Sequence, residues 1–145
     1  HAPEKIMRYD DSAISLSTLY GIRGLIDNLT SRRVWLDCGG NIIIEQLETL
    51  TFIDVNSAKN ISSGSNSILK TNMEAAKEIA RQLRLRNISG MIIIDFINMK
   101  SEASKDTLIE ALKRYIKDDN TVCTFVDITK LGLVELTRKN LLNKF

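Results

Sequence analysis

The sequence has almost no histidine, cysteine or proline. Its single histidine is residue 1 of 145, which excludes a histidine zinc site and catalysis by an internal histidine, as in Ser-His-Asp or Cys-His nucleophiles. The two cysteines, Cys38 and Cys123, are far apart in the sequence, so neither a secreted disulfide scaffold nor a cysteine metal site is expected. The single proline, Pro3, leaves the rest of the chain without a helix breaker.

Long apolar runs and a strong net charge are also missing. No segment approaches the roughly 18 apolar residues of a membrane-spanning helix, so no membrane segment is expected. The formal net charge is only +2, so any basic surface that attracts nucleic acid must be local. Because the chain has neither a signal peptide nor an initiator methionine, we expect it to be a piece of a longer intracellular protein.

What the sequence does contain is two short apolar runs that each end on an aspartate. They lie within residues 42–58 and 90–99 and lead to Asp54 and Asp95. Runs of this length, rich in β-branched residues and bounded by polar residues or glycine, are typical of buried strands. A carboxylate at the end of a buried strand is costly to ionise without a partner. If the two strands are neighbours, a divalent cation would neutralise the pair.

The pattern of the whole chain predicts an α/β fold with a mixed β-sheet, an N-terminal antiparallel meander followed by βαβ-type elements, flanked by helices. At 43% hydrophobic residues, the core suffices for one domain, or for one domain and a fragment of another. The expected elements are a helix or extended lead-in at 12–28, strands at 34–37, 42–46 and 50–55, a loop at 57–71, a helix at 72–85, a strand at 91–95, a helix from Ser101 or Ser104 to 117, a strand at 121–127 and a helix at 131–140.

Local signals refine this outline. Gly-Gly-Asn at 39–41 predicts a hairpin turn, and Thr71 or Asn72 is expected to cap the helix that follows. The Ser- and Asn-rich loop at 57–71 is either an ordinary surface loop or a segment that closes over a substrate. Trp35 and Phe52 are expected in the core.

The candidate chemistry is that of a hard metal ion. Asp54 and Asn56 are two residues apart, so on a strand their side chains share one face. With Asp95 they form an oxygen-only ligand set, which favours Mg²⁺ or Mn²⁺ over zinc. Mg²⁺ on such ligands suits in-line phosphoryl displacement by a metal-activated water. The alternative is that either aspartate only stabilises a turn or caps a helix.

Other side chains have less specific signals. Asp127 is either a third acidic ligand or, as we expect, part of a turn, and Asn98 is close enough to Asp95 in sequence to reach the metal shell. Phe96 is a better candidate than Trp35 for stacking on a nucleobase.

A basic helical face is predicted within residues 72–86. Lys77, Arg81 and Arg84 recur at helical spacing, and Arg86 lies just beyond. The plainer interpretation is a solvated face with ion pairs to glutamates of the same helix. The functional alternative is a set of phosphate contacts along a nucleic-acid strand.

Several of these motifs resemble the ribonuclease E/G family. Phe-Ile-Asp-Val-Asn-Ser-Ala at 52–58 resembles that family's Ile-Asp-Val/Ile-Asn-Ser/Thr signature, and residues 71–86 resemble its next segment nearly residue for residue. Gly-Met-Ile-Ile-Ile-Asp-Phe-Ile-Asn-Met at 90–99 resembles its Gly-Leu-Ile-Val-Ile-Asp-Phe-Ile-Asp-Met block. Residues 33–45 and 130–138 fit as well, so the resemblance covers most of 32–140.

The resemblance implies a Mg²⁺-dependent endoribonuclease, with Mn²⁺ able to substitute, that cleaves single-stranded, often A/U-rich RNA in rRNA and tRNA processing and mRNA decay. The catalytic centre would lie in a DNase I-like subdomain, with Asp54 and Asp95 as metal ligands and Asn56 in support. Candidate RNA contacts are Lys59, Lys70, Lys77, Arg81, Arg84 and Arg86.

The resemblance also implies an organisation. Residues 1–31 are expected to be the tail of a preceding RNase H-like subdomain, and residues 32–145 the DNase I-like catalytic subdomain. The family's S1 domain, its 5′-sensor region and its Cys-Pro-x-Cys zinc-link do not match any part of this sequence, so zinc is not expected here. The full-length protein is expected to be a cytoplasmic homo-oligomer, bacterial or organellar.

The sequence departs from the family pattern at two relevant positions. Asn98 replaces an aspartate, so that position cannot supply a charged ligand. Lys59 replaces an arginine, which keeps the charge but loses bidentate phosphate binding. The alternative function is a non-catalytic RNA-binding or assembly module of a larger ribonuclease, which would respond to Mg²⁺ only through ordinary salt screening.

Overall fold

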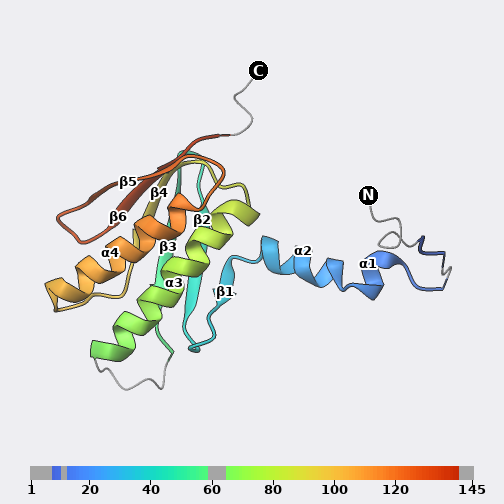
Figure 1. Ribbon diagram of the computed structural model, residues 1–145, viewed down its shortest axis with the longest axis horizontal. Coiled ribbons are helices and arrows are strands. Elements are labelled where there is room, and N and C mark those ends of the chain that lie inside the picture. Colours follow the sequence, from blue (N-terminus) through green and yellow to red (C-terminus); the bar gives the residue numbers. More distant parts are fainter. Residues whose placement is uncertain (1–7, 11–12, 59–64, 141–145) are drawn as a thin grey trace. The chain divides into compact units, whose positions relative to one another are not determined.

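The computed structural model describes residues 8–10, 13–58 and 65–140 (Figure 1). The chain divides into two compact units, His1–Ser31 and Arg32–Phe145. The first unit contains two helices, α1 (Leu16–Leu19) and α2 (Ile22–Thr30), where the sequence predicted a helix or an extended lead-in. Gly21 interrupts the helical segment between them, because its φ of +61° is a left-handed conformation that suits glycine.

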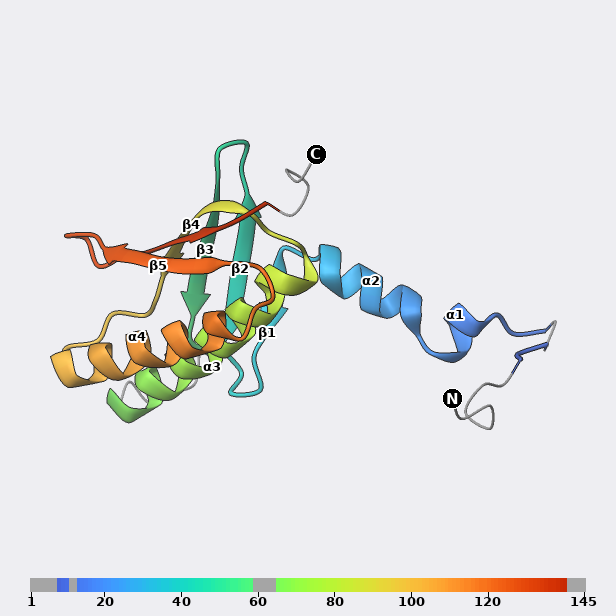
Figure 2. The ribbon, with the colours of Figure 1, turned by 45° about the horizontal axis from the view of Figure 1, so that its top comes forward.

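The second unit is built on a six-stranded mixed sheet, which confirms the predicted α/β fold. The strands are β1 (Arg33–Trp35), β2 (Asn41–Gln46), β3 (Leu50–Asn56), β4 (Gly90–Asp95), β5 (Cys123–Ile128) and β6 (Val134–Arg138), in the spatial order β1-β2-β3-β4-β6-β5. β3 and β4 are parallel, and the other neighbouring pairs are antiparallel. The helices α3 (Ser65–Leu85) and α4 (Glu102–Lys117) lie side by side along the sheet (Figures 1 and 2).

The two faces of the sheet differ in burial. Ile53 and Val55 of β3, and Ile92 and Ile94 of β4, are buried in the core, where they pack with apolar residues of α3 and α4. The alternate residues of both strands point to the opposite face, since side chains alternate along a strand. Asp54 and Asp95 are on that second face, which we call the open face. The fold therefore keeps both carboxylates out of the core.

The predicted antiparallel meander is confirmed, but one of its residues is not buried as predicted. β1 pairs antiparallel with β2, and β2 with β3, and Gly39 in the first turn has the positive φ that the Gly-Gly-Asn signal predicted. Trp35 is 66% exposed, so its expected place in the core was wrong. The reason is the alternation of the strand, which directs Trp35 to the open face, where its ring lies 5.6 Å from the guanidinium carbon of Arg33. Phe52, on the same face, is only half-buried.

The helix predicted at 131–140 was also wrong, because this segment forms β6. Its buried residues are Val134, Leu136 and Arg138, a period of two that packs one face of a strand on the core. Gly132, with a φ of +88°, closes a tight hairpin from β5. Asp127 is likewise within β5 and not in the predicted turn.

α3 begins at Ser65, seven residues before the predicted helix start, so residues 65–71 are not a loop. Thr71 and Asn72 are fully buried inside the helix and not at its start, which makes the predicted capping role wrong. The Thr71 hydroxyl donates to the Ser67 carbonyl one turn back. Packing of this turn on the core outweighs the low helix propensity of its serine and asparagine residues. By contrast, α4 begins after Ser101 and ends at Lys117 as predicted.

A buried ion pair lies at the end of the sheet opposite Asp95. Arg138 Nε donates to Asp119 Oδ2 at 2.8 Å, and the two side chains are 3% and 5% exposed. Arg138 Nη1 also donates to the Ile88 carbonyl. Burial alone would raise the pKa of the Asp119 carboxyl, but hydrogen bonds from Arg138 and the Thr121 N–H and the Arg138 charge outweigh it, so the pKa is lowered. Nearby, burial and the Asp119 charge raise the pKa of the Cys123 thiol to about 11, so it is not a thiolate at neutral pH.

Within the described residues, no helix is both long enough and apolar enough to cross a lipid bilayer.

Candidate functional site

The structure brings Asp54 and Asp95 together at the carboxyl ends of two parallel strands. The register of β3 and β4 pairs Asp54 directly with Asp95, and neighbouring strands are about 4.8 Å apart. Because paired residues share a face, both carboxylates point to the open face, where Asp95 is exposed and Asp54 half-buried. Ligand sites in open α/β sheets commonly lie outside the carboxyl ends of strands.

Asn56 is placed to orient one of these carboxylates. Its Nδ2 donates a hydrogen bond to Asp54 Oδ2 at 2.9 Å. It is two residues beyond Asp54, on the same face of β3. This bond holds one oxygen of Asp54, and the strand register places Asp95 beside it, so the three predicted catalytic residues form one group.

The donor set fits a hard divalent cation. Within the described part of the chain, neither Asp54 nor Asp95 forms an ion pair. The same residues contain no metal-binding group of three or more His, Cys, Asp or Glu side chains, so this site has two carboxylates and an amide. Two adjacent carboxylates without a cationic partner repel one another. An oxygen-only set of two carboxylates and an amide suits Mg²⁺, which keeps several waters or substrate oxygens in its shell.

A glycine allows the turn after β1 to approach the Asn56 end of β3. A Cβ on Gly40 would lie 2.7 Å from the Asn56 carbonyl oxygen and 3.0 Å from Thr71 Cγ2. The contact with the Asn56 carbonyl is too short for a real Cβ atom, and the contact with Thr71 would force its methyl group to shift, so glycine suits this position. The adjacent Cys38 N–H donates to Glu74 Oε1 of α3 at 3.1 Å. The turn, the strand end and α3 are thereby packed together.

Asn72 supports Asp95 from the other side, a role that the sequence did not suggest. Its Nδ2 donates to the Ile97 carbonyl at 2.7 Å, and its Oδ1 accepts from the Ile97 N–H at 3.1 Å. This fully buried side chain therefore holds the backbone two residues beyond Asp95. The sequence offers only an asparagine at the start of a helical pattern, which predicts a helix cap.

We expect Asn72→Ala to lower the free energy of unfolding by about 2–3 kcal/mol. The substitution leaves the Ile97 N–H and carbonyl without their partner, and an unsatisfied buried polar group costs about 1–3 kcal/mol. Urea unfolding would measure the change, with Lys77→Ala on the exposed face of the same helix as the control, expected within about 0.5 kcal/mol of wild type. Equal stability of Asn72→Ala and the control would contradict the supporting role of Asn72.

The predicted RNA-contacting cations are not gathered at the carboxylates. Lys59 lies outside the described residues. Lys70 is exposed and directly precedes Thr71, so it is at the Asn56 end of α3. Since an α-helix rises about 1.5 Å per residue, Arg84 is roughly 18 Å further along α3 than Asn72.

Ion pairing accounts for part of the basic face of α3, as the plainer interpretation predicted. Arg81 pairs with Glu78 at 2.8 Å. Arg86 donates from Nε to Gln82 Oε1 at 2.7 Å. Lys77, Arg81 and Arg84 line a shallow hollow of about 240 Å³, which residues 35–37 also border. This hollow is on the flank of the sheet that carries β1.

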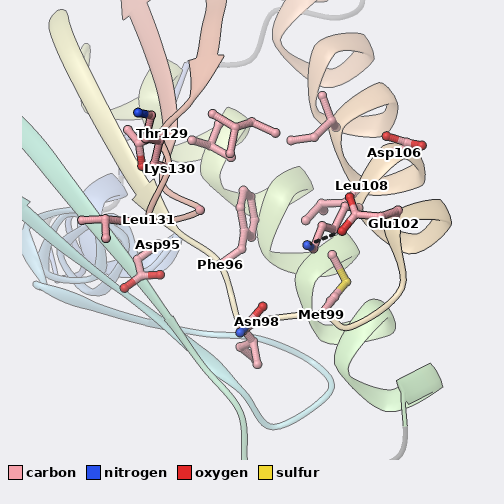
Figure 3. Close-up of a pocket in the computed structure, with 16 residues that line it drawn as sticks. Asp95, Phe96, Asn98, Met99, Glu102, Asp106, Leu108, Thr129, Lys130 and Leu131 are labelled. Carbon is pink, nitrogen blue, oxygen red and sulfur yellow. Dashed lines mark hydrogen bonds and ion pairs between the residues drawn. The ribbon is translucent and has the colours of Figure 1, made fainter.

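A larger pocket, of about 380 Å³, adjoins Asp95 (Figure 3). Its walls are the segment after β4, the first turns of α4 and the β5–β6 hairpin. We call it the Phe96 pocket, because Figure 3 shows the Phe96 side chain between the hairpin and α4. Its lining residues are Asp95, Phe96, Ile97, Asn98, Met99, Glu102, Lys105, Asp106, Leu108, Ile109, Ile128, Thr129, Lys130, Leu131, Gly132 and Val134.

Comparison with known proteins gives consistent matches. Residues 1–141 match the model of a family described as "Ribonuclease E/G family". The chain is 39% identical over 144 residues to "Ribonuclease E/G-like protein, chloroplastic" of Arabidopsis thaliana, covering 95% of this chain and 14% of that protein. It is 46% identical over 129 residues to "Ribonuclease E" of Synechocystis, covering 88% and 19%. It is 39% identical over 123 residues to "Ribonuclease G" of Salmonella typhimurium, covering 83% and 25%.

Proposed function

Because this chain belongs to the ribonuclease E/G family, we propose that it contains the catalytic centre of a Mg²⁺-dependent endoribonuclease. The observation that carries the proposal is the pairing of Asp54 with Asp95 on neighbouring parallel strands. Both carboxylates face away from the core, and the described residues offer them no cation. A family model over 1–141 and relatives named ribonucleases support the assignment.

In this proposal Asp54 and Asp95 hold Mg²⁺, and Asn56 fixes the orientation of Asp54 through its 2.9 Å hydrogen bond. Mg²⁺ or Mn²⁺, when bound, supplies a water of lowered pKa and neutralises phosphate charge. Asp95 stays exposed beside the Phe96 pocket, so the scissile phosphate can reach it from the open face. Asn72 and Gly40 keep the two strand ends in place.

The proposed substrate is single-stranded RNA, A/U-rich where the family resemblance applies, in RNA processing and mRNA decay. Lys70 is at the end of α3 that lies nearer to Asn56 of β3. It is therefore better placed for a phosphate contact than the other cations of α3. Lys77, Arg81, Arg84 and Arg86 extend away from the carboxylates and serve at most a more distant part of the strand. Lys59 remains a candidate by sequence.

The chain spans 14 to 25% of the length of the three relatives described above, so the activity of a whole protein is part of the proposal. We propose that an S1 domain, a 5′-sensor region and other copies of the chain complete the enzyme. One relative is named chloroplastic and two are bacterial, which supports a cytoplasmic or organellar location.

Titration with Mn²⁺ tests the metal site directly. We expect saturable NMR line broadening of residues at the ends of β3 and β4, lost in both Asp54→Asn and Asp95→Asn. Asp127→Asn, an exposed carboxylate of β5, is the matched control and should leave the titration unchanged. Each titration is run with and without a short uncleavable oligonucleotide, since RNA phosphates complete a Mg²⁺ shell.

Two results would contradict the proposal. The first is absence of saturable binding under both conditions, which would favour the non-catalytic RNA-binding or assembly module. The second is an equal loss of broadening in Asp127→Asn, which would mean a diffuse response to negative surface charge and no specific site. A binding module would respond to divalent ions only as to other salts.

A further inference from the structure

The Phe96 pocket is an open hollow with both apolar and polar lining residues, which suits a small ring with polar edges. Its volume of about 380 Å³ is within the range of about 300–1,000 Å³ typical of small-ligand sites. Its apolar walls come from three separate elements, namely the segment after β4, α4 and the β5–β6 hairpin. The apolar side chains include Phe96, Met99, Leu108, Ile109, Ile128 and Leu131.

Phe96 is the only aromatic residue among those that line the pocket. It follows Asp95 directly in the chain and is half-buried, packed on one side against the core. Figure 3 shows its ring between the hairpin and α4, with Asp95 at the end of β4 just before it. A ring fixed on one side by the core and open on the other offers a π-face for stacking.

The charges of the pocket disfavour a phosphate. Glu102 is paired with Lys105 at 2.7 Å. The other charged lining residues are Asp95, Asp106 and Lys130, so two negative charges face one positive charge. A second phosphate would meet a net negative wall, whereas a neutral ring would not. Asn98, at the rim, carries both a donor and an acceptor that can read the edge of a base.

From these features we infer that the Phe96 pocket binds one unpaired nucleobase next to the scissile phosphate. The inference rests on the proposed function, because Asp95 belongs both to the carboxylate pair and to the pocket wall. A phosphate held at Asp54 and Asp95 therefore brings the base of an adjoining nucleotide to the pocket mouth. Stacking on Phe96 needs an unstacked, unpaired base, so the pocket selects single-stranded RNA at the cleavage position.

The test removes the base from the substrate and the ring from the protein. The intact ribonuclease that carries this chain cleaves a short RNA with one mapped scissile bond, in which an abasic residue replaces either neighbouring nucleotide. For one of the two positions we expect kcat/KM to fall by about 5- to 140-fold, the equivalent of one base–aromatic stack. In Phe96→Leu, which keeps apolar bulk but has no π-face, the same abasic residue should cause no further loss.

Two further variants separate stacking from folding. We call the fall in kcat/KM that the abasic residue causes the abasic penalty. Phe96→Tyr keeps the ring and should retain this penalty. Phe125→Leu removes a ring that packs against the core from β5, outside the pocket lining, and should retain the penalty as well. Binding of an RNA with 2-aminopurine at the sensitive position to Asp54→Asn protein gives a signal without cleavage, and its quenching should disappear only when Phe96→Leu is added.

The outcomes distinguish the two proposals. An undiminished abasic penalty in Phe96→Leu, or quenching that persists there, would overturn the pocket assignment even if Asp54→Asn is inactive. No abasic effect at either position in the wild-type enzyme would overturn it as well. Normal cleavage by Asp54→Asn would instead overturn the proposed function, and the pocket inference with it.

Discussion

Asp95→Asn and Asp54→Asn in the intact ribonuclease are each expected to lower RNA cleavage by about 10³-fold or more, with the fold unchanged. Each substitution removes one of the two adjacent negative charges that would hold the metal, and loss of a single electrostatic contact to a reacting phosphate or oxyanion already costs about 10²–10³-fold. Asparagine is close to aspartate in shape, so packing at the strand end should persist. Single-turnover cleavage of a labelled single-stranded RNA measures the effect.

The controls for this experiment come from the same sheet. Asp127→Asn removes an exposed carboxylate from β5 and should keep cleavage near the wild-type rate. Asn56→Ala should show a smaller loss than either aspartate variant, because it frees Asp54 without removing its charge. Full turnover by Asp95→Asn would show that the pair of carboxylates is not the catalytic centre.

The second large effect concerns stability. Asp119→Ala is expected to lower the free energy of unfolding by about 3–5 kcal/mol at pH 7, because it leaves the Arg138 guanidinium buried without its carboxylate. Urea unfolding measures the change. Glu110→Ala is the matched control, since it removes an exposed pair with Lys113, and should differ from wild type by less than about 1 kcal/mol. A loss of similar size in both variants would contradict a special role for the buried pair.

The Asp119 effect should also depend on pH in a definite direction. The pKa of Asp119 is lowered in the folded protein, chiefly because hydrogen bonds from Arg138 and Thr121 outweigh its burial. Its stabilising contribution is therefore present above the unfolded-state pKa of about 3.9 and is lost as pH falls through the folded-state value. The difference in unfolding free energy between wild type and Asp119→Ala should narrow toward pH 3. A difference that stays constant from pH 7 to pH 3 would contradict this account.

The carboxylate pair could be predicted because its signals are local. The runs leading to Asp54 and Asp95 are too apolar and β-branched for any element but a buried strand. A helical segment between two strands favours a parallel connection, which aligns their carboxyl ends. The structure confirms the strands and their pairing. What the two aspartates do chemically remains a prediction.

The errors arise where tertiary contacts decide. Residues 131–140 were expected to form a helix, but the neighbouring strand β4 pairs with β6 and imposes a period of two. Residues 65–71 have poor helix formers, yet buried Thr71 and Asn72 extend α3 through this turn. Both cases show packing overriding intrinsic propensity.

Asn72 and the Phe96 pocket could not be predicted for a related reason. The partner of Asn72 is the backbone of Ile97, which nothing in either local sequence specifies. The pocket needs three elements to meet, including a hairpin whose second strand was expected to be a helix. Contacts between distant segments leave no periodic signal.

Under the proposed function, the in-register pairing of β3 and β4 also couples catalysis to strand alignment. A slip of β4 by one residue would turn Asp95 toward the layer of α3 and α4 and bring Ile94 to the open face. Such a slip would bury a charge and expose an isoleucine. The packing of the buried face therefore disfavours a register in which the two carboxylates do not lie together. In an ensemble of partly folded chains, only molecules with completed β3–β4 pairing would have both carboxylates in place.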